Sequence, residues 1–297
     1  MTAEQAAAVL GVVHDAEEQD GVGPLSEHVL LHLRYAGEPQ GGEPQARDVL
    51  AWQDGQLAGY GHLDLTDPVH GPSGELLTGP RFRRRGLGLA LARALIAEAG
   101  AQDLRLWAHG DLPAAAGLAA VAGFERSRSL WQLRRPLTIP VEAPQLPAGV
   151  TVRTFEVGRD EDAWVKLNAA AFASHPEQGG WTRSDLDLRE REPWFDPAGF
   201  FLAERAGRIA GFHWTKVHDE AGGATGEVYV VGVDPAERGS GLGRALTLTG
   251  LRHLRDRGLA QVMLYVDGDN TPAIRLYESL GFARWHTDVM YSRASGG

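Results

Sequence analysis

Hydrophobic and polar positions in the second half of the chain follow two clear periodicities. Apolar residues that alternate or run continuously predict strands, here at 151–155, 199–205, 208–217, 226–235, 261–267 and 283–293. Apolar residues spaced three and four apart predict helices, here at 160–172, 182–192, 242–256 and 271–281. The expected order, β-α-α-β-β-β-α-β-α-β, is typical of an α+β fold with a mixed sheet.

The first half of the chain repeats part of this pattern. Three of its segments match segments of the second half in the same order: 83–100 with 238–258, 104–110 with 262–268, and 120–135 with 278–293. The offset is 155 positions between Gly86 and Gly241 and 158 between Gly123 and Gly281. Agreement in the same order with so small a gap indicates a duplicated unit, so we expect two tandem domains of one fold.

A proline-rich segment separates the two halves. Residues 136–149 contain four prolines and no hydrophobic periodicity, which is typical of a linker. We place the first domain at 1–138, the linker at 139–149 and the second domain at 150–297. A chain of 297 residues accommodates two domains, since domains cluster near about 100–150 residues.

The composition indicates a soluble protein. Hydrophobic residues make up 43% and charged residues 23% of the chain, and no apolar run reaches the roughly 18 residues of a membrane span. The amino terminus lacks the basic start of a secretory signal, so we expect a cytoplasmic protein without a membrane partner. The chain has no cysteine, which excludes disulfides, thiolate metal sites and cysteine nucleophiles.

The net charge of −10 limits the class of partner. It disfavours nonspecific binding to nucleic acid and suits a cationic small molecule, although solubility alone accounts for such a charge in many proteins. We expect a monomer. One basic cluster, which could hold an anion, stands out in the acidic chain: Arg81, Arg83, Arg84 and Arg85.

The glycine-rich segment from Arg238 to Gly243 carries the clearest chemistry. It follows a predicted strand and opens a predicted helix, so its N–H groups converge where a pyrophosphate binds well. Arg238 and Arg244 can add charged hydrogen bonds. The alternative is a loop that needs glycine only for its turn. A Rossmann dinucleotide site is excluded, because the preceding strands form a meander and no βαβ unit carries the fingerprint.

These features resemble a known superfamily. A strand ending Val-Asp-Pro, the R-x-x-G-x-G loop, the asparagine of DGDN and the tyrosine of RLYESLGF together resemble the GNAT superfamily of N-acetyltransferases. Four further motifs resemble the mycothiol synthase family, whose members are tandem GNAT enzymes: HPEQGGWT, WFDPAGF, GFHWTKVH and GEVYVVGVDP. The resemblance spans the whole chain and is weakest before residue 75.

The resemblance implies a reaction. An acetyl group would pass from acetyl-CoA to the cysteinyl amine of a glucosaminyl-inositol, giving mycothiol and CoA. One alternative within the same chemistry is acetylation of another small amine, such as an aminoglycoside, or of a protein amino terminus. The alternative from another class is a module that senses acetyl-CoA without turnover.

The resemblance also assigns roles to residues. Glu227 is the expected base, acting through water, and Tyr277 is the expected acid that protonates the leaving thiolate. Taken singly, a strand glutamate is more often solvated and a helical tyrosine more often packs. Around the acceptor the resemblance places Glu27, Glu177, Lys216, Glu227 and Tyr265. For Glu27 an exposed position in a helix's first turn is nearly as good an interpretation.

The acetyl-CoA site is expected in both halves. In the second half it would include Val231, Gly232, Val233, Arg238, Gly239, Ser240, Gly241, Leu242, Gly243, Arg244, Asn270 and Arg275. In the first half it would include Leu76, Leu77, Thr78, Arg84, Arg85, Gly86, Leu87, Gly88 and Leu89.

The repeat predicts that only the second half performs chemistry. Tyr277 corresponds to Ala119, Glu227 corresponds to Pro72, and Asn270 corresponds to Leu112. We therefore expect the first half to hold acetyl-CoA at most, without transfer.

Metal and sugar-binding side chains are weakly indicated. His175, His213, His218 and His286 form no helical i, i+4 pair with a carboxylate partner, and we expect no metal. Three tryptophans could be sugar platforms, although packing is the better interpretation: Trp181, Trp194 and Trp214.

Overall fold

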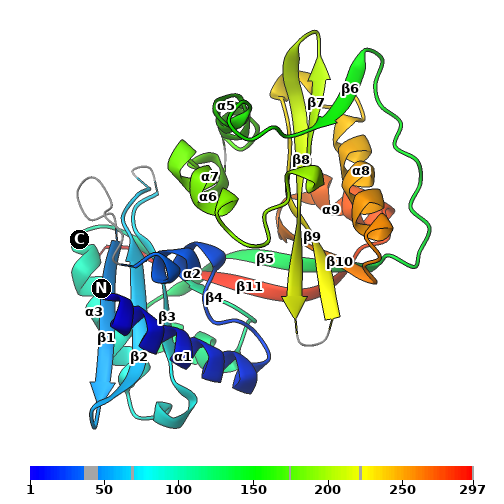
Figure 1. The fold of residues 1–297 in the computed structure, drawn as a ribbon. Helices are drawn as coiled ribbons and strands as arrows, with labels where there is room; N and C mark the ends of the chain where they lie inside the picture. The colour runs from blue at the N-terminus through cyan, green and yellow to red at the C-terminus, as the bar shows by residue number, and fades with distance from the viewer. Residues whose placement is uncertain (37–45, 68–69, 174, 221–222, 296–297) are drawn as a thin grey trace. The chain divides into compact units, whose positions relative to one another are not determined.

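The computed structural model describes residues 1–36, 46–67, 70–173, 175–220 and 223–295 (Figure 1). It divides the chain into two compact units. Unit 1 comprises residues 1–130 with 287–297, and unit 2 comprises residues 131–286. Helices pack on both faces of a mixed sheet in each unit, which confirms the predicted α+β fold.

Unit 1 carries its strands in the order β1-β2-β3-β4. The strands are antiparallel except for the parallel pair of β3 and β4. Helices α1 and α2 pack on one face, and α3 and α4 pack on the other. The elements are α1 (Ala3–Asp20), α2 (Glu27–Arg34), β1 (Ala46–Gln53), β2 (Gln56–Asp64), β3 (Ser73–Thr78), α3 (Leu87–Ala99), β4 (Leu104–Ala108) and α4 (Pro113–Ala122).

Unit 2 carries its strands in the order β10-β9-β8-β7-β6. Here β9 and β10 are parallel, while β6 to β9 are antiparallel. The elements are β6 (Val150–Thr154), α5 (Glu161–Ala171), α6 (Pro176–Gly179), α7 (Arg183–Glu190), β7 (Phe200–Arg205), β8 (Arg208–Glu220), β9 (Gly223–Val233), α8 (Leu242–Asp256), β10 (Gln261–Asp267) and α9 (Thr271–Ser279). Every helix and strand predicted in this unit is present. The one-turn helix α6 and two 3-10 turns, Pro197–Gly199 and Pro235–Glu237, were not predicted.

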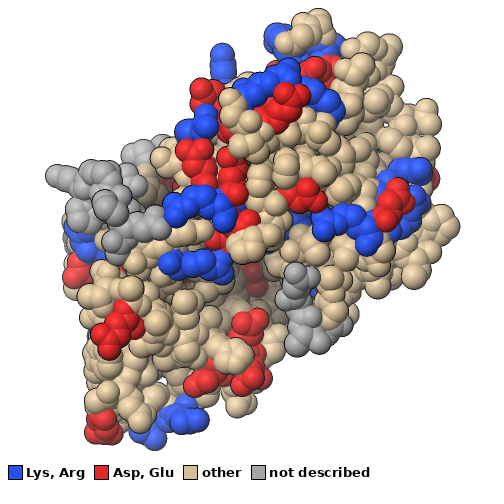
Figure 2. Space-filling view, in the orientation of Figure 1, with Lys and Arg blue, Asp and Glu red and all other residues tan. Residues whose placement is uncertain are grey.

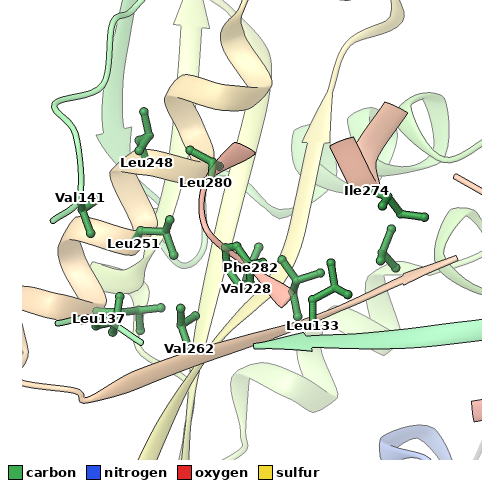
Figure 3. Packing of buried hydrophobic residues seen from close by; sticks show 13 residues of the cluster. Leu133, Leu137, Val141, Val228, Leu248, Leu251, Val262, Ile274, Leu280 and Phe282 are labelled. Carbon is green, nitrogen blue, oxygen red and sulfur yellow. The ribbon is translucent and has the colours of Figure 1, made fainter. Parts of the chain in front are cut away.

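Apolar cores on both faces of its sheet stabilise unit 2. Leu248 and Leu251 of α8 and Ile274 of α9 pack against strand residues such as Val228 and Val262 (Figure 3). On the other face α5 and α7 cover an aromatic core that includes Trp164, Trp214 and Phe212. α7 begins with a capping box between Thr182 and Asp185.

The closing strand of each sequence half completes the other unit. β5 (Glu125–Pro136) contributes its second part, from Trp131, to unit 2, where it lies next to β10. β11 (Ala283–Arg293) contributes its last part to unit 1, where 289–293 pair with 104–108 of β4. The repeat led us to expect each half to close with its own strand. The two closing segments are so similar that the pattern could not tell which sheet takes which.

The compact units therefore differ from the division drawn on the sequence at 1–138, 139–149 and 150–297. No helix in the described part of the chain is long and apolar enough to cross a membrane. Acidic and basic side chains are interspersed on the face shown in Figure 2.

Candidate active site

The glycine-rich loop of unit 2 joins the end of β9 to the start of α8. A 3-10 turn (Pro235–Glu237) leads to Gly239 and Gly241, whose φ angles are 78° and 86°. Glycine adopts these left-handed values without steric cost. Gly241 caps α8, and Ser240 Oγ accepts a hydrogen bond from the Leu242 amide at 3.3 Å. First-turn amides have no carbonyl partner within their helix, so this loop suits an anionic pyrophosphate.

Strands β9 and β10 separate just before this loop. Their recorded parallel pairs are Gly226 with Val262 and Glu227 with Met263. The described part of the chain records no pair between the two strands beyond these, so residues 231–233 have no partner in β10. The backbone groups of 231–233 on this side are therefore available to a ligand, as a bound thioester and its pantetheine arm require.

A β-bulge lies at the point of separation. Trp214 of β8 pairs with Val230 of β9, whereas the next residue, Thr215, pairs with Val228. Tyr229 is thus an extra residue in β9. A bulge bends its strand and redirects side chains, and bulges are common beside active sites.

Gly232 is fixed by packing as well as by position. A Cβ atom there would lie 2.4 Å from a ring carbon of Phe212 and 3.2 Å from the ring of Phe172. A side chain at position 232 would therefore clash with the two phenylalanine rings. Substitution of Gly232 would displace the strand that borders the opening.

Glu227 lies at the last recorded pair between β9 and β10 and is 6% exposed. Its Oε2 atom lies 2.6 Å from Nε2 of His218, whose side chain is 26% exposed. Lys216 pairs with Glu227 and His218 pairs with Thr225 in the β8–β9 register, so these side chains share one face of the sheet. A buried carboxylate with a more exposed imidazole as its neighbour can accept a proton and pass it outward.

Lys216 lies among aromatic rings. Its ammonium nitrogen is 4.3 Å from the centre of the Trp194 ring and 5.1 Å from that of Tyr229. The residue is 8% exposed, so these cation–π contacts act with little competition from water. Trp214 is fully buried and packs against Trp194 and Tyr229. The packing interpretation is thus right for Trp214.

Tyr277 lies on α9, half-buried, with its ring against Phe282 at a centroid distance of 5.8 Å. Burial raises the pKa of Tyr277 to about 12. The Tyr277 hydroxyl group makes no hydrogen bond with any of the described residues. The hydroxyl therefore keeps its proton at neutral pH and can donate it to a ligand.

Comparison with known proteins identifies the family that this geometry belongs to. The model of the "Acetyltransferase (GNAT) family" matches residues 15–124 and again residues 164–282. The chain belongs to the GNAT acetyltransferases. It is an acetyl-CoA-dependent N-acetyltransferase, as the sequence predicts.

Curated relatives of this GNAT chain share one name. The mycothiol acetyltransferase of Thermobispora bispora is 63% identical over 289 residues, covering 96% of this chain and 95% of the relative. The mycothiol acetyltransferase of Acidothermus cellulolyticus is 55% identical over 300 residues, covering 96% of this chain and 90% of the relative.

Solved structures show the same tandem arrangement. A GCN5-related N-acetyltransferase from Sphaerobacter thermophilus has a TM-score of 0.70 at 27% identity, covering 100% of this chain and 95% of that one. A tandem GNAT protein from the clavulanic acid biosynthesis pathway has a TM-score of 0.75 at 21% identity, covering 100% and 98%, and shows the fold alone. The predicted pair of tandem GNAT domains is confirmed.

Other predicted acetyl-CoA-binding residues of unit 2 have contacts within the protein. Asn270 caps α9, since its Oδ1 accepts a hydrogen bond from the Ala273 amide at 3.2 Å. Arg244 lies 2.9 Å from a carboxylate oxygen of Glu142. Arg238 and Arg275 are exposed, and Arg238 donates a 3.4 Å hydrogen bond to the carbonyl of Ala171.

The predicted acceptor residues are placed in part. Tyr265 lies on β10, is 42% exposed, and its hydroxyl accepts a 2.8 Å hydrogen bond from Gln132. Glu177 belongs to α6, but its side chain lies outside the described residues. Glu27 is the first residue of α2 in unit 1, as its first-turn interpretation predicts. Its role toward an acceptor stays a prediction.

The GNAT loop of unit 1 repeats the backbone of unit 2. Gly86, with a φ angle of 84°, caps α3, and 76–78 follow the last recorded parallel pair of β3 and β4. Arg83 is bound by both oxygens of Asp20 at 2.7 Å. Arg84 and Arg85 are exposed, so they remain the basic candidates for phosphate contacts.

The predicted base and acid of unit 2 have no match in unit 1. Ala119 stands where Tyr277 would be. The strand register sets Ser73 opposite Arg105, where Glu227 lies opposite Met263. The counterpart of Glu227 is thus Ser73 rather than the predicted Pro72, because the offset between the halves changes along the repeat.

Sequence reasoning missed the contact between His218 and Glu227. The histidine was considered only as a metal ligand, on spacing along the chain. The hairpin register of GFHWTKVH against GEVYVV could have placed it beside the carboxylate, since paired strands bring residues distant in sequence onto one face.

Proposed function

We propose that this chain is a mycothiol acetyltransferase, which transfers acetyl from acetyl-CoA to the amine of cysteinyl glucosaminyl-inositol and gives mycothiol and CoA. The observation that carries the proposal is 63% identity, over 95% of its length, to a protein of that name. The geometry supports it, because the buried Glu227 lies where β9 and β10 separate.

The transfer begins with removal of a proton from the acceptor ammonium. Glu227 accepts that proton through a water molecule. His218, 2.6 Å from the Glu227 carboxylate, then passes the proton on toward solvent. The neutral nitrogen then attacks the thioester carbon. Backbone groups of 231–233 stabilise the oxyanion that forms.

The transfer ends with collapse of the tetrahedral intermediate. The carbon–sulfur bond breaks, the acetyl group stays on nitrogen, and CoA leaves as a thiolate. Tyr277 donates its hydroxyl proton to that sulfur, since its pKa of about 12 keeps it protonated until the thiolate forms. As the intermediate collapses, the nitrogen also gives up its second proton, which restores the Tyr277 hydroxyl. The proton taken by Glu227 leaves to solvent, so each turnover forms one amide and one thiol and releases one proton.

Polar side chains at the same opening suit a polyhydroxylated acceptor. Lys216 shares a sheet face with Glu227, and Tyr265 is exposed on β10. Glu177, in α6 of the same unit, belongs to the acceptor set that the resemblance implies. Hydroxyl groups are bound well by such carboxylates, ammonium groups and phenols.

The first GNAT repeat is proposed to bind acetyl-CoA without turnover. Its loop keeps Gly86 and Arg85, but Ala119 and Ser73 replace the acid and the base. We further propose that the protein acts in the cytoplasm as a monomer on a small molecule, and that nucleic acid, membrane and metal take no part in the transfer. The net charge of −10 supports the exclusion of nucleic acid.

Mass spectrometry of products tests this function. Purified chain is incubated with acetyl-CoA and cysteinyl glucosaminyl-inositol, and one acetyl group is expected on the cysteinyl nitrogen. An acceptor whose amine is already blocked is the matched control, because its thiol remains free to react.

A folded protein that releases no CoA with this acceptor would exclude the proposed function. A panel containing an aminoglycoside and a peptide with a free amino terminus separates the alternatives. If acetyl transfer to the aminoglycoside or to the peptide is faster than transfer to cysteinyl glucosaminyl-inositol, the faster substrate identifies the acceptor class instead.

A further inference from the structure

Three side chains that can bind a metal ion lie close together in unit 1. They are far in sequence from the glycine-rich loop and from the predicted base of unit 2. His32 comes from α2, Asp48 from β1 and His62 from β2. Asp48 and His62 are direct partners in the antiparallel register of β1 and β2, so their side chains share one face of the sheet. The candidate ligand atoms of all three residues lie within 4.8 Å of one another.

The separations between these atoms match the edges of a coordination polyhedron. Asp48 Oδ2 lies 3.0 Å from His32 Nε2, and Asp48 Oδ1 lies 3.1 Å from His62 Nδ1. Ligand atoms bound to zinc at about 2.0–2.2 Å lie roughly 3–3.5 Å from each other.

The Asp48 carboxylate is held in place by a neighbouring hydroxyl group. Tyr60 donates to Asp48 Oδ1 at 2.7 Å and orients the carboxylate, as outer hydrogen-bond partners of metal ligands do. Side-chain exposures of 23% for His32 and 14% for Asp48 leave an entry path from solvent.

His62 gives the second, independent indication. It is 1% exposed, and its Nε2 atom is buried without a hydrogen-bond partner among the described residues. Its Nδ1 atom lies 3.1 Å from Asp48 and 3.3 Å from Tyr60. The unpartnered Nε2 atom leaves the buried imidazole only partly compensated for the loss of water, and coordination of the ring to a cation would offset part of that cost.

We propose that His32, Asp48 and His62 form a site for a divalent transition metal of the zinc class. Two imidazoles and one carboxylate are a donor set that such ions prefer, with a fourth position left for water. The ion would hold α2 against β1 and β2. The earlier expectation of no metal came from spacing along helices, which cannot reveal donors that three elements bring together.

The neighbouring cluster of Glu75, His109 and Asp288 does not compete for this role. His109 lies 3.1 Å from Asp288 and 3.6 Å from Glu75. Although burial opposes protonation, these two carboxylates raise the pKa of His109 to about 10, so its imidazole carries a proton at neutral pH. A protonated imidazole has no lone pair for a metal.

Two titrations of the full chain, after treatment with a chelator, test the site. Binding of Co²⁺ is monitored by visible absorption, and binding of Zn²⁺ is measured by calorimetry. One ion per chain is expected to bind. The His32→Ala and Asp48→Asn variants should bind Co²⁺ more than about 100-fold more weakly, since loss of an outer partner alone costs about 10–100-fold. His32 is partly exposed, so its variant is expected to fold, and circular dichroism verifies this.

His28→Ala is the matched control. His28 lies on the same helix, its ring centroid 6.4 Å from that of His62, but it pairs with Asp64 rather than Asp48. This variant should bind the ion as the unmodified chain does. Absence of saturable binding by the unmodified chain overturns the proposal, and so does binding that His32→Ala and Asp48→Asn leave unchanged. The readout involves no acetyl transfer, so its outcome is independent of the proposed function.

Discussion

Glu227 and His218 form a pair in which a buried carboxylate contacts a more exposed imidazole at 2.6 Å. We expect His218→Ala to lower kcat about tenfold, less than the 100- to 10,000-fold of losing the base itself, because Glu227 remains in place. The KM for acetyl-CoA should change little. Steady-state kinetics at saturating acceptor measures both constants.

The His218→Gln variant separates two roles of the imidazole. A glutamine can hydrogen-bond Glu227 but cannot carry a proton. Restored kcat in this variant would assign His218 to positioning alone, while kcat as low as in His218→Ala would support proton transfer. Unchanged kcat in both variants would contradict any role.

Tyr277 gives the second prediction at this scale. Burial raises its pKa from 10.0 to about 12, so activity should not fall through ionisation of this residue until the pH approaches 12. Tyr277→Phe should lower kcat by about 100-fold or more, because it removes a proton donor. The Kd of acetyl-CoA, measured by calorimetry, should stay the same. Equal loss of kcat and affinity would refute the role as acid.

Single residues were predictable where a motif fixes them. The turn chemistry of Gly239 and Gly241 and the helix start at Leu242 follow from local sequence, and the structure has both. The pairing of His218 with Glu227 depends on strand register, and the grouping of His32, Asp48 and His62 depends on three elements. Such contacts are nonlocal, so periodicity and spacing could not predict them.

At the scale of elements, β11 is held in unit 1 by a buried charge cluster. Asp288 of β11 accepts a 2.9 Å hydrogen bond from the Gly110 amide and lies 3.1 Å from His109. The ion pairs with Asp288 and Glu75 raise the pKa of His109 from 6.5 to about 10. The stabilisation is therefore complete below pH 6.5 and is lost as the pH rises toward 10.

Chemical denaturation between pH 6.5 and 10 measures how the free energy of unfolding depends on His109. The free energy of unfolding should fall between pH 6.5 and 10, and His109→Asn should lower it by about 3–5 kcal/mol at pH 6.5 because two buried carboxylates lose their partner. The variant should show a weaker pH dependence over the same range. A pH dependence identical in both proteins would contradict the assignment.

Most elements of unit 2 were predictable because their hydrophobic periodicity is strong. The predicted helix at 242–256 and strand at 261–267 have the observed bounds. The strand predicted at 208–217 extends to Glu220, since its last residues are polar and gain their structure from pairing with β9. Propensity alone does not carry that information.

At the scale of the whole molecule, the exchanged strands decide which fragments are complete. A fragment of residues 131–286 retains unit 2, whereas 150–297 lacks the core residues Leu133, Leu137 and Val141. Each such side chain contributes about 1.5–3 kcal/mol by burial. We expect the first fragment to unfold cooperatively and the second to be unfolded or aggregated.

Thermal unfolding followed by circular dichroism compares the two fragments directly. Equal stability of both would contradict the exchange of closing strands. The repeat in the sequence revealed the duplication and the tandem GNAT domains, which the family match confirms. It could not reveal the exchange, because similar closing segments satisfy either sheet and only tertiary contacts choose between them.

Glu227 of unit 2 is proposed as the base for acetyl transfer to the cysteinyl amine. Single-turnover mass spectrometry with acetyl-CoA and cysteinyl glucosaminyl-inositol, comparing the unmodified chain with Glu227→Gln, tests this role. The unmodified chain is expected to give N-acetylated product, and the variant to react about 100- to 10,000-fold more slowly with acetyl-CoA affinity retained. Product formed by Glu227→Gln at the unmodified rate would contradict this role.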